Sequence, residues 1–584
     1  MFGLKFTRWR FVLFAGVSLL AIFRLPYLVP VAPSVSDSYV FGYNNRAGIV
    51  LLLIAVVIGV LWSRGMGLDV PLSHSSAPHI PRWVLAASLL LIASGCLAMV
   101  CFAGRYEGFG ESSYFIDRLW LLAQGKRPYI DFEFAYGAAM LYIPLALGRI
   151  FSLSISNAYY IFWALNHLCG TVLLFWIIDH IEGPVQPRRV VVYLLFFIPS
   201  VCSVYSMGAN YSSFRFLFPV FLVFLARRAA SRGLAFPAYF RFVLLCCSMV
   251  ALLLLISPET AIAFAFACIC IVAFQRPRLD ATALAAAGTL LIGLILVFGA
   301  AAQMHALDTL LADSGGAISF PILPAPHLLV FFTAVFLCSC YVYACCVRGQ
   351  LNNDLLALVA YSLPMLAAAL GRCDPGHVSS NGMGFLLVAI LFLPDGEPLA
   401  TRFRACYLIF SFALPLIGGL LLYMASWQKA AHLNSLSAQD YKESYAVDLS
   451  RLYPAWHGSF FAPFGYRPNG LGSLHTDRVS YGHFEPMIDD GTPAAVRMRI
   501  SELSRNADAA LLLPEDFDRR CEVNVPGERV LIGVLFVMPY FGTPMHKESM
   551  RRPLCDFIHA HYQMSDPPTT ANFRYGLWRA AGTR

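Results

Sequence analysis

The sequence predicts an α-helical polytopic membrane protein of about thirteen transmembrane helices that carries a small C-terminal α/β domain. Of its 584 residues, 58% are hydrophobic and 13% are charged, whereas a soluble protein is about half apolar and about a quarter charged. The long apolar runs end near residue 426, and residues 427–584 hold 17 basic and 17 acidic side chains. The net charge of +8 therefore belongs to residues 1–426, where it indicates membrane topology and not a nucleic-acid partner.

The chain divides into two predicted domains, a transmembrane module over residues 1–426 and a soluble α/β domain over residues 427–584. A helix that crosses a bilayer needs roughly 20 apolar residues. Runs of about this length lie at residues 11–30, 47–63, 83–103, 157–178, 190–206, 212–227, 240–256, 259–275, 282–303, 327–347, 353–371, 379–395 and 402–425.

The basic residues predict the orientation. With a cytoplasmic N-terminus, the inside connections hold fifteen Lys and Arg residues, and the short outside connections hold only Arg46, Arg215 and Arg372. Because cytoplasmic loops are rich in Lys and Arg, we expect a bacterial inner (plasma) membrane protein whose C-terminal domain is extracytoplasmic. The first apolar run follows a basic stretch and precedes the small residue Ala32, so it is either a retained helix or a cleaved signal peptide.

The C-terminal domain has two cysteines, Cys521 and Cys555. In an oxidising compartment a single pair indicates one disulfide, and the alternative is two buried free thiols. Helix patterns lie at residues 494–504 and 545–562, and strand patterns at 509–513, 530–538 and 573–580. We expect this domain to guide an acceptor or to serve the structure, without chemistry of its own.

The longest early outside segment, residues 104–156, predicts two helices that lie along the membrane surface. In the first, Phe115, Leu119 and Leu122 recur on one helical face, and the second, residues 139–150, is apolar but too short to span. Between them, Pro128 and Tyr129 begin a turn fixed by proline.

Charged residues collect on the same predicted outside face. Glu111 lies between a glycine-rich turn and the first surface helix, so it is either a functional carboxylate or a helix cap. Glu259 in the turn after Pro258 has the same two readings. Asn210 and Tyr211 lie in another outside turn.

The outside turn GRCDPGH, residues 371–377, is a compact charged cluster. Arg372 could bind a phosphate or pair with Asp374. His377 could act as an acid, a base or a ligand, or be structural.

Two stretches of this face resemble a known family. Glu111, the sequence LLAQGKRPYIDFEFAYG and the surface helix that follows are similar to the first outside loop of bacterial GT-C glycosyltransferases, the polytopic group related to aminoarabinose and protein mannosyl transferases. The GRCDPGH turn resembles a late outside-loop motif of that group. Family members commonly have two acids where this chain has Gly110-Glu111, and a proline where it has Ala138.

The resemblance implies an enzyme that moves a hexose or pentose from a polyprenyl-phosphate donor to a glycan, lipid or protein acceptor of the envelope, with inversion. Glu111 would be the general base, and Asp131 a second acid that shapes the loop or helps to bind a divalent metal ion. Arg372, Asp374, His377, Glu259 and Tyr129 would contact the substrate or its phosphate, among membrane lipids. The alternatives are a lipid-linked glycan polymerase or ligase, and a non-enzymatic lipid or glycan transporter.

Overall fold

The fold is taken from a computed structural model of the whole chain. It describes residues 2–34, 36–64, 79–103, 111–132, 134–180, 189–231, 236–275, 281–308, 310–311, 319–348, 353–392, 452–458, 460–463, 479–480, 493–505, 508–522, 545–546, 548–567 and 575–581.

Long helices make up most of the N-terminal part. They are α1 (Phe2–Arg24), α3 (Asn45–Arg64), α4 (Arg82–Ala103), α7 (Ile155–His180), α8 (Arg189–Ser203), α9 (Ser213–Ser231), α10 (Phe236–Leu254), α11 (Pro258–Gln275), α12 (Ala281–Gln303), α14 (Pro326–Arg348) and α15 (Asn353–Arg372). Shorter helices are α2 (Asp37–Phe41), α5 (Ser112–Ala123), α6 (Ala139–Ile150), α16 (Pro375–Asn381) and α17 (Met383–Phe392).

Six helices in the described part of the chain are long and apolar enough to cross a membrane. They include residues 9–28, 45–63, 82–101, 155–180, 326–348 and 353–372. The other helices have shorter apolar stretches among the described residues. The helix α8, for example, has 15 residues and a length of about 22 Å, below the roughly 30 Å of a hydrocarbon core. These six helices favour a membrane protein, and the full set of thirteen spans is not confirmed.

Two of the expected spans have different boundaries in the structure. The run at 379–395 is broken at Gly382 between α16 and α17. A Cβ at this position would lie 2.4 Å from the ring of Phe331, so only glycine fits there. The run at 190–206 stops at Ser203, and Met207 adopts a left-handed φ of 53° after a short 3-10 turn. The run at 402–425 lies outside the described residues.

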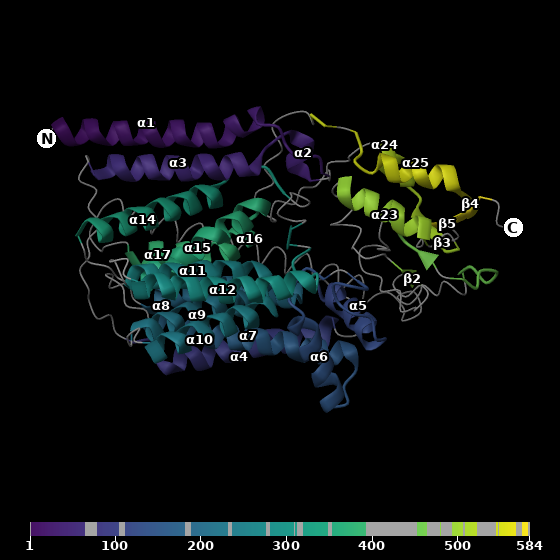
Figure 1. Cartoon of the computed structure of the whole chain (residues 1–584), viewed down its shortest axis with the longest axis horizontal. Coiled ribbons are helices and arrows are strands. Elements are labelled where there is room, and N and C mark those ends of the chain that lie inside the picture. Colours follow the sequence, from purple (N-terminus) through teal and green to yellow (C-terminus); the bar gives the residue numbers. More distant parts are fainter. Residues whose placement is uncertain are drawn as a thin grey trace.

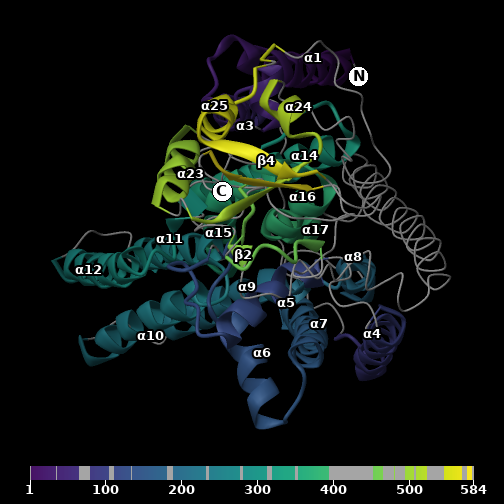
Figure 2. The ribbon, with the colours of Figure 1, turned by 90° about the vertical axis from the view of Figure 1, so that its right-hand side faces the viewer.

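The connections assigned to the outside lie together at one end of the bundle (Figure 1). Backbone hydrogen bonds join them across long sequence distances, from Glu111 to Ser206, from Gly137 to Ile256 and from Phe320 to Gly371. Figure 2 looks onto this end, where the C-terminal sheet lies in front of α3 and α14–α16 and to one side of α5–α7.

Both predicted surface helices are present, as α5 and α6, and they fold back onto α7. Phe115 of α5 stacks on Tyr136 and Tyr159, with ring centroids 5.6 Å and 5.4 Å away. Gly137, just before α6, lies so close to the backbone at Leu255 and Ile256 that a Cβ would be 2.0 Å from the carbonyl carbon of Leu255. A glycine is therefore needed where the first outside loop meets the α10–α11 turn.

The C-terminal domain contains a sheet of five strands with the order β2-β1-β3-β5-β4. The strands are β1 (Phe460–Phe461), β2 (Val479–Ser480), β3 (Ala510–Pro514), β4 (Tyr562–Asp566) and β5 (Tyr575–Ala580), with β1 parallel to both β2 and β3 and the pairs β3–β5 and β4–β5 antiparallel. The helices are α23 (Pro493–Arg505), α24 (Phe517–Glu522) and α25 (Arg552–His561). Every residue of β3 is buried because one face of the sheet packs on these helices and the other on Tyr453 and Phe460.

The expected helix over 494–504 and the strands over 509–513 and 573–580 match α23, β3 and β5. The expected helix over 545–562 is wrong in part, because α25 starts only at Arg552 and the chain turns into β4 at Tyr562. The strand pattern at 530–538 lies outside the described residues.

The C-terminal domain contacts the membrane module through the short helix α2. The backbone N–H groups of Met545 and His546 donate to the carbonyl of Val40, at 2.8 Å and 3.0 Å. The His546 ring stacks on Tyr39 with centroids 4.5 Å apart and planes 6° from parallel. Residues before α25 that were expected to be helical therefore connect the two domains.

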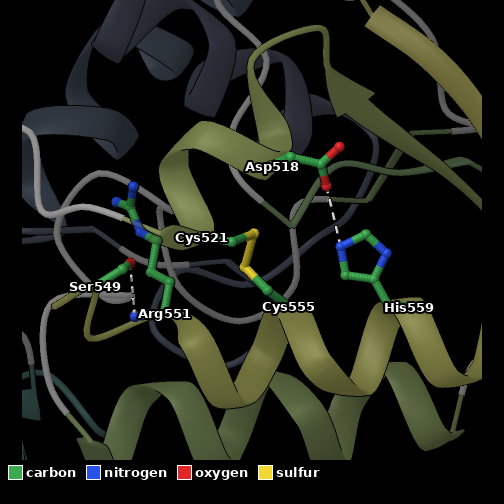
Figure 3. The surroundings of a disulfide bond; sticks show 6 residues. All are labelled: Asp518, Cys521, Ser549, Arg551, Cys555 and His559. Atoms are coloured by element: carbon green, nitrogen blue, oxygen red, sulfur yellow. Dashed lines mark hydrogen bonds and ion pairs between the residues drawn. A yellow bond between two sulfur atoms is a disulfide. The ribbon is translucent and has the colours of Figure 1, made fainter.

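A disulfide joins Cys521 of α24 to Cys555 of α25, with Cα atoms 5.8 Å apart. One helical turn further along, His559 Nε2 lies 3.0 Å from the Asp518 carboxylate, so a second interaction links the same two helices (Figure 3). The bond closes a loop with a sequence separation of 34 residues.

Replacing Cys521 with Ser is expected to destabilise the C-terminal domain by about 3 kcal/mol, because the unfolded chain regains the freedom that the loop removes. Thermal unfolding without reductant, followed by proteolysis of the domain, measures the change. Cys101→Ser, at an exposed free thiol, is the matched control. Equal unfolding temperatures for both variants and the parent would contradict this prediction.

Candidate functional site

Glu111 stands at the start of α5, at the end of the bundle where the connections assigned to the outside lie. Its backbone N–H donates to Ser206 O at 3.0 Å, which attaches it to the loop before α9. The Glu111 side chain is exposed and makes no hydrogen bond that caps α5. The structure therefore does not support the interpretation of this side chain as a helix cap.

The loop from Met207 to Tyr211 packs against Glu111. Tyr159 of α7 holds this loop, since its hydroxyl donates to Met207 O at 2.8 Å and accepts from the Ala209 N–H at 3.0 Å. Gly208 has no room for a side chain, because a Cβ there would lie 2.8 Å from Glu111 Cβ and 2.5 Å from Asn210 Oδ1. Glu111, Asn210 and Tyr211 therefore surround one glycine.

Tyr136 connects this loop to the first outside segment. Its hydroxyl accepts a hydrogen bond from Asn210 Nδ2 at 2.8 Å. The guanidinium carbon of Arg215 lies 4.7 Å from the centre of the Tyr136 ring. The backbone carbonyl of Tyr136 accepts from the Tyr129 hydroxyl at 2.6 Å.

Arg215, at the start of α9, binds Glu259 of α11. The two side chains form a short ion pair and are 12% and 16% exposed. Arg215 Nε also donates to Ser257 Oγ at 3.0 Å, and its Nη1 donates to Asn210 O at 3.1 Å. Glu259 is thus occupied by an arginine that fixes the loop carrying Asn210.

The GRCDPGH turn lies between α15 and α16 and is held from three directions. Asn45 Nδ2 donates to Leu370 O at 2.9 Å, and Phe320 N donates to Gly371 O at 3.0 Å. His327 Nε2 lies 2.9 Å from Cys373 O, and Cys373 has a positive φ of 35°, uncommon for a residue with a side chain. This strained, well-supported backbone fixes the directions of Arg372 and Asp374.

Arg372 reaches the site from the end of α15. Its guanidinium carbon lies 5.8 Å from the centre of the Phe320 ring. Its Nε is buried and has no hydrogen-bond partner, and no carboxylate among the described residues pairs with it. The expected alternative of an Arg372–Asp374 ion pair is therefore not formed, and the guanidinium keeps donors for another group.

Asp374 turns toward His377. Its Oδ1 accepts from the His377 backbone N–H at 3.0 Å, and its Oδ2 lies 2.6 Å from His377 Nδ1. The His377 ring in turn meets the Tyr211 ring edge-on, with centroids 6.3 Å apart.

Charged side chains from several of these segments shift the pKa of the same tyrosine hydroxyls. Burial raises the pKa of the Tyr211 hydroxyl, and the Glu111 carboxylate raises it further; Arg372 opposes this and Asp374 adds to it. Burial also raises the pKa of Tyr136, with Arg215 opposing and Glu111 reinforcing the change. Glu111 and Arg372 thus both shift the pKa of these two tyrosines, although more than 250 residues of the chain separate them.

The pKa of Asp374 lies below its ordinary value. Burial works against its ionisation, but the hydrogen bonds and charge of His377, together with the charge of Arg372, outweigh burial. A carboxyl group with a lower pKa in the folded state than in the unfolded state stabilises the fold. This stabilisation is fully present at a pH above the unfolded-state pKa, and it is lost as the pH falls through the folded-state pKa.

Asp374→Asn should therefore lower the free energy of unfolding by about 2 kcal/mol at pH 7, where the ionised carboxylate and its hydrogen bonds are lost. The difference from the parent should shrink once the pH falls below about 4, the usual Asp value. Thermal unfolding of both proteins between pH 3 and pH 7 measures it. A difference that stays constant over this range would show that ionisation of Asp374 contributes nothing.

Asp131 does not join this site. Its carboxylate accepts from the Arg127 backbone N–H at 2.7 Å and lies 3.3 Å from Arg127 Nε, so it closes its own turn. The backbone hydrogen bond from Arg127 is the main reason that its pKa is lowered. Tyr129 is buried and supports the same turn with a positive φ of 68°. Both residues shape the loop that carries Tyr136.

The described residues contain no group of three or more His, Cys, Asp or Glu side chains placed to hold a metal ion. The acid next to Glu111 in the family pattern is replaced here by Gly110. Among the described residues, Glu111 therefore belongs to no such metal-binding group.

An apolar cavity of about 260 Å³ lies between α5, α6 and the start of α7. Leu119 and Ala123 of α5 line one side, Pro144 and Leu145 of α6 another, and Arg149 lies at its edge. The helix that begins beside Glu111 thus also borders an apolar space.

Tyr136 and Arg215 belong to the site but had no assigned role in the sequence analysis. Arg215 did carry a signal, because it is one of three arginines in the short outside connections. A charge in such a place needs a partner, and Glu259 provides it.

Gly208→Ala should displace Glu111 Cβ or Asn210 by a fraction of an ångström or more, because the new Cβ would lie 2.8 Å from Glu111 Cβ and 2.5 Å from Asn210 Oδ1. A displacement of that size should lower the rate of any reaction at this site by about 100-fold. Gly288→Ala is the control, since a Cβ there meets nothing within 4 Å. Steady-state rates of both variants test this, and equal rates would mean that the site tolerates displacement of Glu111.

Neither a family model, nor a curated protein, nor a solved structure matches this chain. The fold and the site therefore define only its class. The chain is a mostly helical protein, with helices able to cross a membrane and a small C-terminal sheet.

Proposed function

We propose that this protein is an integral-membrane glycosyltransferase that moves a sugar from a polyprenyl-phosphate donor to an envelope acceptor on the outside face. The observations that carry the proposal are two contacts: Glu111 packs against the loop of Gly208, Asn210 and Tyr211, and the Tyr211 ring meets His377 of the turn that holds Arg372. The charges of Glu111 and Arg372 accordingly shift the pKa of Tyr136 and Tyr211. A carboxylate and an arginine at one site match the two charges of this reaction, a proton to be removed and a phosphate to be released.

Glu111 is the general base. The acceptor hydroxyl attacks the anomeric carbon, the bond from that carbon to the phosphate oxygen breaks, and the proton of the hydroxyl passes to the Glu111 carboxylate. The products are the glycosylated acceptor and polyprenyl phosphate. General-base assistance of this kind is worth about 10²–10⁴ in rate.

Arg372 binds the leaving phosphate. A guanidinium with a buried Nε that has no partner within the described residues favours an anionic ligand. Charge that develops on the leaving oxygen is stabilised more strongly by a fixed cation than by water. The neighbouring Asp374–His377 pair and the Arg215–Glu259 pair hold the site around it.

The membrane arrangement follows the same proposal. The six long apolar helices, the helices α8–α12 and α17 and the run at 402–425 correspond to the thirteen predicted spans, with the N-terminus cytoplasmic and the C-terminal domain outside. The disulfide supports an oxidising location for that domain. The cavity beside α5 is apolar and suits part of the isoprenoid chain of the donor.

Mass spectrometry of envelope glycans from cells with and without the protein tests the reaction class. A single missing hexose or pentose on one glycan, lipid or protein is the expected result. Loss of a whole repeating unit would instead identify a polymerase or ligase, and an unchanged set of glycans would reject an envelope transferase.

A further inference from the structure

One face of α7 packs against the loop that carries Asn210 and Tyr211. Tyr159, Trp163, His167 and Gly170 follow one another at intervals of four, four and three residues, so they lie along one side of the helix. Trp163 and His167 are each 0% exposed.

The loop that carries Asn210 and Tyr211 lies against this face. At one end Tyr159 bonds to Met207 and Ala209. At the other end a Cβ on Gly170 would lie 2.2 Å from Ser213 Oγ. Trp163 and His167 fall between these two contacts, opposite the stretch from Ala209 to Ser213.

Several buried polar atoms of this helix face and of the loop have no protein partner among the described residues. They are His167 Nδ1 and Nε2, Trp163 Nε1, Ser213 Oγ and Asn210 Oδ1, all buried and without a hydrogen bond to the described residues. The Trp163 and His167 rings meet edge-on with centroids 5.4 Å apart, so they do not satisfy each other. Buried polar groups are nearly always bonded to protein or to ordered water, and this set offers both donors and acceptors.

We propose that α7 and the loop from Ala209 to Ser213 enclose a binding site for ordered water, and that His167 is the positioning residue at its centre. Neutral imidazole donates from one nitrogen and accepts at the other. A buried water makes about three hydrogen bonds, so it can join His167 to Ser213 Oγ or Asn210 Oδ1.

This site fixes the loop next to Glu111 whatever reaction occurs there. Tyr159 holds the first half of the loop directly, and the water site holds the second half, which ends at Ser213. The inference does not depend on the proposed glycosyl transfer, and its tests need no substrate.

An experimental structure of the whole protein in lipid nanodiscs, at a resolution of about 2 Å that shows ordered water, is the direct test. We expect at least one water within hydrogen-bond distance of a His167 ring nitrogen and of Ser213 or Asn210. A dry contact, or a direct bond from His167 to either side chain, would overturn the proposal.

Hydrogen exchange of the backbone amides of residues 207–213 gives a second test. His167→Leu should speed their exchange by about tenfold, the effect of losing about one hydrogen bond, and His167→Gln should restore part of the protection. His180→Leu, at the other end of α7 where the side chain is 42% exposed, should change nothing at the loop. Equal exchange in the Leu variant and the parent, or no rescue by Gln, would contradict the role of His167.

Discussion

Replacing Glu111 with Gln is expected to lower kcat at least about 100-fold while the protein still folds and inserts. The amide keeps the size of the side chain but cannot take the proton of the attacking hydroxyl. Glu111 is exposed, and the Gln amide keeps the size of the side chain and most of its hydrogen-bonding capacity, so the unfolding temperature should stay close to that of the parent.

The pH dependence separates this role from a structural one. A general base is active only when ionised, so kcat/KM of the parent should fall on the acidic side, and the Gln variant should lose that limb. Asp308→Asn, at an exposed acid between α12 and α14 that pairs with His305, is the matched control and should retain parental rates. A Glu111→Gln variant with full activity would remove the residue from the mechanism.

Arg372→Gln is expected to lower kcat/KM for the lipid-linked donor by about 10²–10³, because a fixed cation no longer faces the leaving phosphate. Arg372→Lys should recover part of this loss through charge alone, without the planar fork of the guanidinium. Arg241→Gln, at an exposed arginine of α10, is the control.

Inhibition by polyprenyl phosphate checks the same assignment at equilibrium. If Arg372 binds the phosphate, the product should bind the Gln variant about 10-fold or more weakly, an effect of one charged hydrogen bond. Product inhibition that is the same in parent and variant would place the phosphate elsewhere.

Much of the bundle can be predicted from the sequence because apolar length and periodicity dominate it. The helices α3, α4, α11, α14 and α15 begin and end within a few residues of the predicted runs. The break at Gly382 could not be predicted. The close approach of the Phe331 ring to Gly382 is a contact between distant segments, which the local sequence does not show. The end of the helix before Tyr562 could not be predicted either, because β4 forms there by pairing with β5.

The site could be predicted in part. Glu111 and the GRCDPGH turn were recognised as separate local patterns, and the structure brings them to the same two tyrosines. Asp131 carries the same resemblance to a family motif but pairs with Arg127 four residues away. Sequence shows the residue type and its neighbours, whereas the choice between a local turn and a distant site is made by packing. The Arg215–Glu259 pair shows this most clearly, because its members come from two helices.

The most direct measurement uses the purified protein in liposomes with polyprenyl-phosphate hexose and pentose donors labelled in the sugar, and membranes from cells lacking the protein as the source of acceptor. The account predicts that label moves to one acceptor while polyprenyl phosphate is released, and that Glu111→Gln stops both. Intact donor after incubation with active parent protein, or label that crosses the bilayer still attached to its lipid, would contradict it.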